Sequence, residues 1–496
     1  MIMLRDLFTG IDATIIGPDV EVTALACDSR QISEGACFAA LNGALRDGHE
    51  FIFDAIERGA KSIICERVIT DKNITNIIVK DSRLALALAA RRLFADPAHL
   101  LKMVGITGTS GKTTTSYLIQ SILHEANLIP GLIGTNGYRY KEHESTTGLT
   151  TPESIDVIKL LRQMLDVGTR SVVMEVSSHS LCQHRVAGID YDVAAFLNLS
   201  HEHLDYHHTL EDYFEAKAIL FRQRLKSNGI AVLNYDDKYA KKLVNEPGLQ
   251  VISFSLNGDT TANIRLLNAK LANNQSELEV ITPRGTLQII SPLIGSFNIE
   301  NILAAVSIAE ALGLAPSAII KGIVKLGVVP GRLEKVNQSG QPLVLIDYAH
   351  KPDALAKALK VTRNITSGRL ICVFGCGGDR DATKRPIMGQ IAAELADWII
   401  VTNDNPRSED PLEIASAIEQ GLRAANANIA ETPDKRGYVI ELDRSQAIRR
   451  AITAANLNDT VLIAGKGHET YQILPQGTRH FDDREEARAV LQKTAC

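Results

Sequence analysis

One stretch indicates the type of fold more strongly than any other: Gly108-Thr109-Ser110-Gly111-Lys112-Thr113-Thr114. It joins the apolar run 103–106 to a helical segment predicted from Lys112 to about Glu125. Glycines let backbone amides approach phosphate oxygens, the helix amino terminus adds partial positive charge, and Lys112 adds a full one. The usual pattern has glycine five positions before Gly111, where Ile106 stands. We interpret the stretch as a variant phosphate loop; the alternative is a glycine-rich turn with a surface lysine.

Composition excludes several classes of protein. The chain has 496 residues, 45% hydrophobic and 22% charged, which predicts three or four folded domains. Its 53 basic and 58 acidic residues give a net charge of −5, so nucleic-acid binding is not expected. No apolar run approaches a membrane span, and Asp6 comes too early for a secretory signal. Seven scattered cysteines suggest reduced thiols. We expect a soluble, cytoplasmic protein that inserts in no membrane.

The pattern of apolar runs predicts an α/β protein with three domains, at residues 1–98, 99–329 and 330–496. In the first domain, strands are predicted at 62–65 and 77–79, and a helix from Ser82 to Phe94 with Asp81 or Ser82 as its cap. Asp96-Pro97 then ends this domain, because the residue before proline avoids helical geometry.

The second and third domains alternate strands with helices, as parallel sheets require. The predicted strands are 171–176, 193–197 and 230–233 in the second domain, and 344–346, 370–374, 398–401 and 461–464 in the third. Residues 249–292 are predicted to form a small antiparallel addition, and 298–312 a helix. Ligands bind at the carboxyl ends of strands in such sheets, so the polar and glycine-rich loops there are the candidate sites.

Acidic and histidine side chains follow two strands of the second domain. Glu175 stands near a strand end, where it is either a magnesium ligand or a solvent-facing acid. Arg185, in the polar run that follows, either clamps an anion or lies on the surface. The stretch 198–208 contains four of the thirteen histidines. Two alternatives stay open for this stretch: a zinc site, or one histidine that takes part in a magnesium site.

Lys217 is the most informative single residue of the second domain. On a helix predicted from Leu210 to Lys226, it stands at the centre of an apolar face made by Tyr213, Phe214, Leu220 and Phe221. Burial would disfavour its ammonium form and make the amine nucleophilic. The alternative is a lysine whose stem lies on the apolar face while its charge reaches water.

Taken together, these motifs resemble the Mur ligase family of ATP-dependent, amide-forming enzymes. The resemblance covers nearly the whole chain, and the order and spacing of the motifs make it specific. The matching pieces are 108–114, 175–179, 198–207, 213–217, 298–301, 331–332 and 347–350. It implies an amino-terminal UDP-binding α/β domain, a central parallel-sheet domain of the phosphate-loop ATPase type and a carboxyl-terminal Rossmann-like domain.

The resemblance implies a role for each ambiguous residue around ATP. Lys217 would be carbamylated by CO₂ and would help to hold Mg²⁺ with Thr113, Glu175 and His203, which disfavours zinc. Lys112, Lys217 and Arg332 would be the catalytic residues. The ATP-binding residues would be Gly108, Thr109, Ser110, Gly111, Lys112, Thr113, Thr114, Asn298, Asn301, Arg332 and Asp347.

The resemblance also assigns the two other substrates. UDP-N-acetylmuramoyl-L-alanyl-D-glutamate would contact Ser29, Arg46, Thr150, Thr151, Ser177, Gln183 and Arg185. Leu149 departs from the family pattern, in which a polar residue often precedes the paired threonines. The incoming amino acid, meso-diaminopimelate, would contact Arg380, Asp404, Asn405, Pro406, Arg407, Gly465 and Glu469. Arg407 could grip the second carboxylate that distinguishes diaminopimelate from lysine, because a guanidinium makes two parallel hydrogen bonds.

The implied reaction joins the diaminopimelate amine to the D-glutamate γ-carboxylate through an acyl-phosphate, in peptidoglycan synthesis. We expect a monomer whose third domain closes onto the second. Three alternatives remain open. A lysine-adding homologue and folylpolyglutamate synthetase are disfavoured by the Arg407 motif, the second also by the extra amino-terminal domain. A nucleotide-dependent switch or motor would leave the amino-acid pocket unexplained.

Overall fold

The computed structural model describes residues 2–43, 46–69, 74–145, 148–272 and 275–494. It divides into two compact units. The first contains Met1–Ala269, Leu278–Ile290 and Ile299–Lys325, and the second contains Lys270–Glu277, Ser291–Asn298 and Leu326–Cys496. Three main sheets carry the fold, with five, eleven and six strands in chain order. The mixed α/β class is therefore confirmed, while the domain boundaries at 98 and 329 stay a prediction.

The amino-terminal sheet has the strand order β2-β7-β6-β5-β4. β2 runs antiparallel to β7, and the other neighbours are parallel. Both predicted strands are present, as β6 and β7. The bounds are β2 Ala13–Ile16, β4 Leu25–Ala26, β5 Cys37–Ala39, β6 Ser62–Cys65 and β7 Thr75–Val79, with the short pair β1 Ile2–Met3 and β3 Glu21–Val22, and helices α1 Leu4–Leu7 and α2 Ile52–Glu57.

Helix α3 (Ser82–Leu93) follows this sheet and begins and ends as its sequence predicts. The Asp81 carboxylate accepts a hydrogen bond from Leu84 N at 2.8 Å, so Asp81 is the cap. Asp96 has a φ of +46°, a left-handed conformation before Pro97 that directs the chain out of the helix. Arg91 of α3 pairs with Asp190 of the next domain at 3.0 Å.

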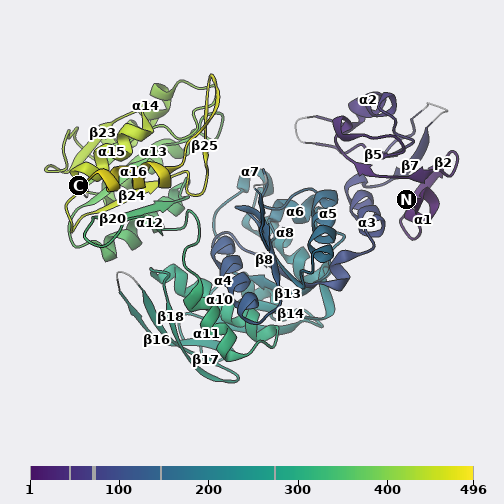
Figure 1. Ribbon diagram of the computed structural model, residues 1–496, viewed down its shortest axis with the longest axis horizontal. Helices are drawn as coiled ribbons and strands as arrows, with labels where there is room; N and C mark the ends of the chain where they lie inside the picture. Colours follow the sequence, from purple (N-terminus) through teal and green to yellow (C-terminus); the bar gives the residue numbers. More distant parts are fainter. Residues whose placement is uncertain (1, 44–45, 70–73, 146–147, 273–274, 495–496) are drawn as a thin grey trace. The chain divides into compact units, whose positions relative to one another are not determined.

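The second domain is built on an eleven-stranded sheet in the order β11-β10-β9-β12-β8-β13-β14-β15-β16-β17-β18. Figure 1 labels β8, β13 and β14 of this sheet, and β16, β17 and β18 at its end. The strand that precedes the phosphate loop, β8, lies between β12 and β13 and is parallel to both. The bounds are β8 Lys102–Thr107, β9 Pro130–Gly134, β10 Gly137–Tyr140, β11 His143–Ser145, β12 Ser171–Glu175, β13 Tyr191–Phe196, β14 Leu225–Asn234, β15 Gln250–Ser255, β16 Ile264–Leu271, β17 Ser276–Thr282 and β18 Gly285–Ser291.

Two predictions for this domain need correction. The predicted antiparallel addition at 249–292 belongs to the main sheet, and its first part is parallel, because β15 is parallel to β14 and β16 is parallel to β15 where they pair. The last two strands, β17 and β18, are joined by only two residues, which fits the predicted antiparallel pairing. The helix that carries Lys217 ends at Gln223, and Lys226 belongs to β14. The helices are α4 Lys112–Glu125, α5 Ser154–Asp166, α6 Ser178–Cys182, α7 Leu204–His207, α8 Leu210–Gln223, α9 Ala240–Leu243, α10 Ser296–Ala311 and α11 Pro316–Lys325.

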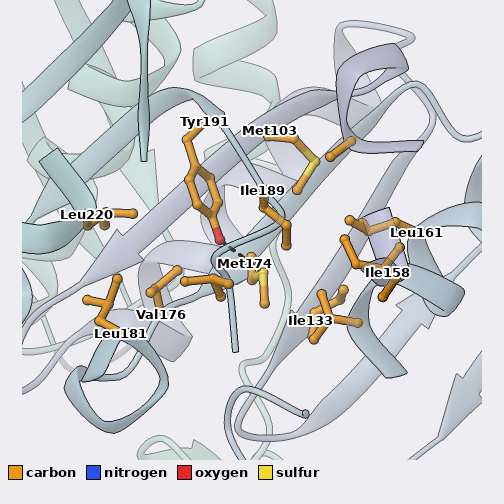
Figure 2. Packing of buried hydrophobic residues seen from close by; sticks show 14 of the residues in the cluster. Met103, Ile133, Ile158, Leu161, Met174, Val176, Leu181, Ile189, Tyr191 and Leu220 are labelled. Atoms are coloured by element: carbon orange, nitrogen blue, oxygen red, sulfur yellow. Dashed lines mark hydrogen bonds between the residues drawn. The ribbon is translucent and has the colours of Figure 1, made fainter. Parts of the chain in front are cut away.

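Apolar side chains from strands and helices fill the space beside this sheet (Figure 2). Met103 of β8, Met174 of β12 and Ile158 of α5 are almost fully buried there. Tyr191 is buried among them, and its hydroxyl lies 3.3 Å from the Met174 sulfur. Burying apolar area at about 25 cal/mol per Å² makes this core a main source of stability. It fixes the strand ends on which the loops of the site stand.

The carboxyl-terminal sheet has the order β19-β20-β24-β21-β22-β23, and its last five strands are parallel. Val344 and Ile346 of β20 join one core with α15 and α16, whereas Leu345 joins another with α12, α13 and α14. Both faces are thus covered by helices, as in Rossmann-like folds. The bounds are β19 Glu334–Lys335, β20 Leu343–Asp347, β21 Leu370–Phe374, β22 Trp398–Val401, β23 Gly437–Ile440, β24 Thr460–Ala464, β25 Tyr471–Leu474, β26 Gly477–His480, α12 Pro352–Ile365, α13 Lys384–Leu395, α14 Pro411–Ala424, α15 Arg444–Ala454 and α16 Asp483–Thr494.

Candidate active site

The phosphate loop leaves β8 at Thr107 and enters α4 at Lys112. Gly108 and Gly111 have φ of +153° and +86°, which an ordinary side chain resists. A Cβ on Gly111 would also lie 2.3 Å from Asn301 Oδ1. Asn198, after β13, holds the loop by two hydrogen bonds. Its backbone carbonyl accepts a hydrogen bond from Thr109 N, and its Oδ1 accepts one from Ser110 N, both at 2.9 Å. The loop therefore has the strand-turn-helix setting that the sequence predicts.

Lys112 and Thr113 begin helix α4. The Lys112 ammonium donates to the carbonyls of Gly108 and Thr109 at 2.8 and 3.2 Å. Thr113 is buried and donates its hydroxyl to Glu175 Oε2 at 3.1 Å; Thr114 is buried as well. Glu175 thus faces the loop, and the alternative of a solvent-facing acid is wrong for it.

Thr135 holds the other side of the Glu175 carboxylate. Its backbone N donates to Oε1 at 3.1 Å and its hydroxyl to Oε2 at 2.9 Å. A Cβ on Gly134 would lie only 2.3 Å from Oε1, so the close approach depends on glycine. Our sequence analysis missed Thr135. Its position at the end of β9, next to the strand that carries Glu175, is the signal that could have found it.

Lys217 of α8 is buried in the apolar face that the sequence predicts, at 1% exposure. Its Nζ lies 4.4 Å from the centroid of the Tyr213 ring, and donates to Gly108 O at 3.2 Å and Thr107 Oγ1 at 3.4 Å. Burial, with the nearby charge of Lys112, lowers the pKa of this amine well below its ordinary value. The alternative of a charge that reaches water is therefore wrong.

His203 lies in an aromatic cluster beside Tyr213. It has a left-handed φ of +58°, and its ring centroid lies 4.9 Å from that of His179 and 6.0 Å from that of Tyr213. His207 stacks on Tyr213 and its Nε2 lies 2.9 Å from Ser178 Oγ. Within the described ranges, no three histidine, cysteine or carboxylate side chains are grouped to hold a metal ion.

Glu175 and Thr113 nevertheless fit a magnesium ion. Both are buried, both offer oxygen atoms, and these oxygens lie 3.1 Å apart beside the phosphate loop. Mg²⁺ is usually held by one or two carboxylates together with substrate phosphates, so a large protein cluster is unnecessary.

Several residues predicted for the muramoyl substrate meet near Glu175. Thr151 Oγ1 donates to the Glu175 carbonyl at 2.8 Å and lies 3.3 Å from Ser177 N, while Thr150 Oγ1 lies 3.2 Å from Thr135 Oγ1. Arg185 donates to Thr151 O at 3.1 Å and to Gln183 Oε1 at 2.6 Å. The preceding residue, Leu149, is 44% exposed.

Arg185 is also held by an acid that our sequence analysis missed. Its Nε lies 3.0 Å from Glu153, which in turn pairs with Arg83 of α3 at 3.2 Å. Arg83 also donates to Asn42 O at 3.2 Å, in the loop predicted to contact UDP. Of the two predicted UDP contacts, Ser29 is buried and Arg46 is exposed; residues 44–45 of this loop lie outside the described residues.

The second unit carries three of the remaining predicted ATP contacts, Asn298, Arg332 and Asp347. Asp347, at the end of β20, accepts from Leu333 N and Ala349 N at 2.8 and 2.9 Å, and burial raises its pKa. The Arg332 guanidinium lies over the Tyr348 ring, 5.4 Å from its centroid. Asn298 is buried on α10 and donates to Ile294 O at 2.8 Å. Asn301 lies on the same helix, in the first unit.

The residues predicted to bind the amino acid come from three loops at one edge of the carboxyl-terminal sheet. Asn405, after β22, donates to Glu469 Oε2 at 3.0 Å, and Glu469 follows β24. A Cβ on Gly465 would lie 3.3 Å from Asp404 Oδ2, so these two residues also meet. Pro406 is buried, with its carbonyl against Gly378 of the loop after β21.

Arg407 and Arg380 approach each other over Gly377. A Cβ on that glycine would lie 3.0 Å from Arg407 Nη1 and 3.9 Å from Arg380 Cγ. Arg407 has a left-handed φ of +54° and donates to Gly378 O at 2.7 Å, whereas Arg380 is exposed. Two guanidinium groups thus lie together beside Gly377, and a carboxylate and an amide meet at the same edge of the sheet, an arrangement suited to a zwitterion.

Family models match three successive ranges of the chain. They are the Mur ligase family catalytic domain over residues 21–104, the Mur ligase middle domain over 106–309 and the Mur ligase glutamate ligase domain over 331–467. With the phosphate loop and parallel sheets described above, these matches define the class of the protein as an ATP-dependent ligase.

Individual proteins agree over the full length. The chain is 42% identical to the UDP-N-acetylmuramoyl-L-alanyl-D-glutamate–2,6-diaminopimelate ligase of Geobacter metallireducens, covering 99% of this chain and 98% of that one. It is 43% identical to the ligase of the same name from Solibacter usitatus, over 95% and 94%. A solved structure of a ligase with that name matches with a TM-score of 0.70 and 32% identity, covering 100% and 99%. The chain belongs to the Mur ligase family.

The described parts of the chain contain no helix that is both long and apolar enough to cross a membrane.

Proposed function

We propose that this ligase joins meso-diaminopimelate to the D-glutamate γ-carboxylate of UDP-N-acetylmuramoyl-L-alanyl-D-glutamate and cleaves ATP to ADP and phosphate. Relatives that are 42% and 43% identical carry the name of this reaction. The single observation that carries the proposal is the pocket formed by Asp404-Asn405-Pro406-Arg407 with Glu469. It supplies a guanidinium for a carboxylate and a carboxylate for an ammonium, the pair of groups at the distal end of diaminopimelate.

In the first step, an oxygen of the γ-carboxylate attacks the γ-phosphorus of ATP, the bond to the bridging oxygen breaks, and ADP leaves. Both reactants are anions, so their repulsion must be offset. Lys112 and the amides of the phosphate loop supply positive charge in a fixed geometry. Lys112 has to exchange the carbonyls of Gly108 and Thr109, to which it donates here, for phosphate oxygens. Arg332 adds a second cation to the proposed machinery.

Thr113 and Glu175 would hold magnesium, with His203 and a carbamate on Lys217 as further ligands. When bound, the metal ion neutralises charge on the phosphates. The Lys217 amine suits carbamylation, since its depressed pKa leaves it neutral enough to attack CO₂. Carbamylation converts this buried amine into a carbamate anion, with release of a proton, beside Lys112, which supplies an opposite charge.

In the second step, the neutral amine of diaminopimelate attacks the acyl carbon, an amide bond forms, and the bond to phosphate breaks. Phosphate leaves as hydrogen phosphate, with the proton that the amine gives up. Arg407 discriminates against lysine, because lysine has no second carboxylate and would leave this guanidinium without its partner. Thr151, Ser177 and Arg185 bind the muramoyl dipeptide in this proposal, and Ser29 and Arg46 bind the UDP moiety.

We further propose that the ligase acts in the cytoplasm as a monomer, in peptidoglycan synthesis. The six described cysteines are free thiols, which suits a reducing compartment.

The test is release of phosphate from ATP by the purified chain in the presence of Mg²⁺ and UDP-N-acetylmuramoyl-L-alanyl-D-glutamate. Diaminopimelate, lysine or no amino acid is added, and the nucleotide product is identified by mass. Turnover that requires diaminopimelate supports the proposal. Turnover that prefers lysine would identify a lysine-adding ligase, and hydrolysis that needs neither would indicate a nucleotide-dependent switch.

A further inference from the structure

A lysine that has no role in the proposed reaction lies at the centre of the amino-acid pocket. Lys466 follows β24 and is completely buried, at 0% exposure. Its Nζ lies 3.0 Å from Glu469 Oε2, 3.2 Å from Asn405 Oδ1 and 3.7 Å from Asp404 Oδ1. Those three are residues to which the proposed function assigns diaminopimelate. A buried ammonium costs much free energy unless it is paired, so these contacts are needed to keep it there.

The backbone on both sides of Lys466 is shaped to hold it inward. Gly465 and Gly467 have φ of +118° and +54°, in a region that side chains disfavour. A Cβ on Gly467 would lie 2.6 Å from Tyr348 Cβ, and one on Gly465 would lie 3.3 Å from Asp404 Oδ2. The turn closes with a hydrogen bond from Glu469 N to Lys466 O at 2.9 Å. Lys466 and Glu469 are therefore fixed relative to each other by backbone as well as by charge.

The acceptors around Lys466 are not all satisfied. Asn405 Oδ1 accepts from Lys466 and from Ile473 N, and its Nδ2 donates to Glu469, so this amide is fully oriented. Asp404 is 94% buried (6% exposed), yet among the described residues its Oδ1 has no hydrogen-bond partner, with Lys466 too far away at 3.7 Å. A buried carboxylate oxygen without a donor is costly, and it indicates a place where a donor of the substrate can bind.

We propose that Lys466 is a positioning residue that determines specificity in the amino-acid pocket; this inference rests on the proposed function. Together with Asp404 and Glu469, the two acids nearest to it, Lys466 gives a net charge of −1 rather than −2 for these three side chains. Arg407 and Arg380 are not in this sum and stay available to a carboxylate. The contacts of Lys466 also fix the orientation of the Asn405 and Glu469 side chains. Without this cation, two carboxylates would attract a lone side-chain ammonium and repel the distal carboxylate of diaminopimelate. The pocket would then shift its preference from the zwitterionic end of diaminopimelate toward the cationic end of lysine.

The experiment compares the full-length wild type with Lys466→Met and Lys466→Arg. The values of kcat and KM are measured for diaminopimelate and for lysine, at saturating ATP and UDP-muramoyl dipeptide. We expect Lys466→Met to lower the selectivity ratio, kcat/KM for diaminopimelate over that for lysine, by about tenfold or more, mainly through KM. Lys466→Arg keeps the charge and should stay within about threefold of the wild-type ratio.

Arg369→Met is the matched control. Arg369 is a partly buried cation that pairs with Asp459 at 2.6 Å. Arg369 directly precedes β21 and Asp459 directly precedes β24, so this ion pair lies at the amino ends of the strands, whereas Lys466 and its neighbours follow their carboxyl ends. The loss of Arg369 should lower both kcat/KM values together and leave their ratio unchanged, which is what a merely structural role of Lys466 would also do.

The outcomes separate the two proposals. If wild type turns over without need of diaminopimelate, the proposed function fails and this inference fails with it. If wild type requires diaminopimelate and Lys466→Met keeps the wild-type ratio, only the inference is overturned. A Lys466→Arg variant with the low ratio of Lys466→Met would overturn the charge argument. Should Lys466→Met fail to fold, Lys466→Gln, which retains a donor without charge, is measured in its place and judged by the same ratio.

Discussion

Among the residues that the structure describes, two lysines are buried completely or nearly so, and their surroundings are opposite. Lys217 in the first unit meets an aromatic ring, a hydroxyl and a carbonyl, and among the described residues no carboxylate lies within ion-pair distance of it. Lys466 in the second unit lies 3.0 Å from Glu469 and near Asp404. The first environment lowers the pKa of the amine, whereas the second places two carboxylates beside it. Burial alone therefore does not tell what a lysine does; its charged neighbours do.

The largest expected effect is the loss of activity when the side-chain amine of Lys217 is removed. Lys217→Met should lower kcat by about 10²- to 10³-fold, since it deletes a group proposed to hold a metal ion at the phosphates. Steady-state phosphate release measures this. Depletion of CO₂ should slow the wild type and leave the residual rate of the variant unchanged. Full activity of the variant, or indifference of the wild type to CO₂, would disprove the carbamate.

The next effect is on stability and concerns the paired lysine. Lys466→Met should lower the free energy of unfolding by about 3 kcal/mol, because the buried Asp404 and the partly buried Glu469 then lose the cation nearest to them. Urea unfolding followed by circular dichroism measures it. Adding Glu469→Gln to Lys466→Met should restore part of the loss. If the single variant is as stable as the wild type, the ion pair contributes nothing and the contrast between the two lysines disappears.

For Lys217, which has no carboxylate within ion-pair distance among the described residues, substitution should change the free energy of unfolding in the opposite direction. Lys217→Met should raise the free energy of unfolding at pH 7 by about 1 kcal/mol in CO₂-depleted buffer, because it removes a buried polar group that is poorly compensated. The pKa of Lys217 is depressed in the folded state, so the unfolded chain binds more protons between that pKa and about 10.4. Wild-type stability should therefore rise with pH across this window. In the variant this contribution should be missing, as urea midpoints over a pH series would show.

The smallest effect concerns the charges around Lys217. The charge of Glu202 raises the pKa of the Lys217 amine, against the larger effects of burial and Lys112. Glu202→Gln should therefore shift the pH profile of carbamylation to lower pH, with a change in midpoint smaller than one pH unit. Carbon-13 NMR of the protein under labelled CO₂ follows the carbamate directly. Glu211→Gln is the control, because Glu211 lies on the exposed side of the same helix and pairs with Lys242.

The sequence predicted best where a pattern is local. Helix α4 begins at Lys112 and ends at Glu125 as expected, since a glycine turn, a strand before it and an apolar stripe after it all lie within one short segment. The burial of Lys217 followed from helical spacing alone. The antiparallel prediction for residues 249–292 was wrong for β15 and β16, because short alternating strands do not reveal whether their partners run parallel or antiparallel.

The site was predicted less completely than the fold. Thr135, Glu153 and Lys466 each hold a predicted site residue, yet none stands in a pattern that the residue types alone would single out. Thr135 meets Glu175 across neighbouring strands, and Glu153 joins Arg185 to Arg83, which lies 70 positions earlier in the chain. Such partners depend on strand order and on loops that converge from distant positions.

By itself, the sequence determined the class of fold, the phosphate loop and the apolar face around Lys217, because backbone geometry and periodic burial act over a few neighbouring residues. Only the tertiary structure decided the partners of the buried charges. Lys466 is separated from Asn405 by 61 positions and lies 3.2 Å from it in space. The energy of a buried charge depends on what lies within a few ångströms, and the folded sheet alone sets those distances.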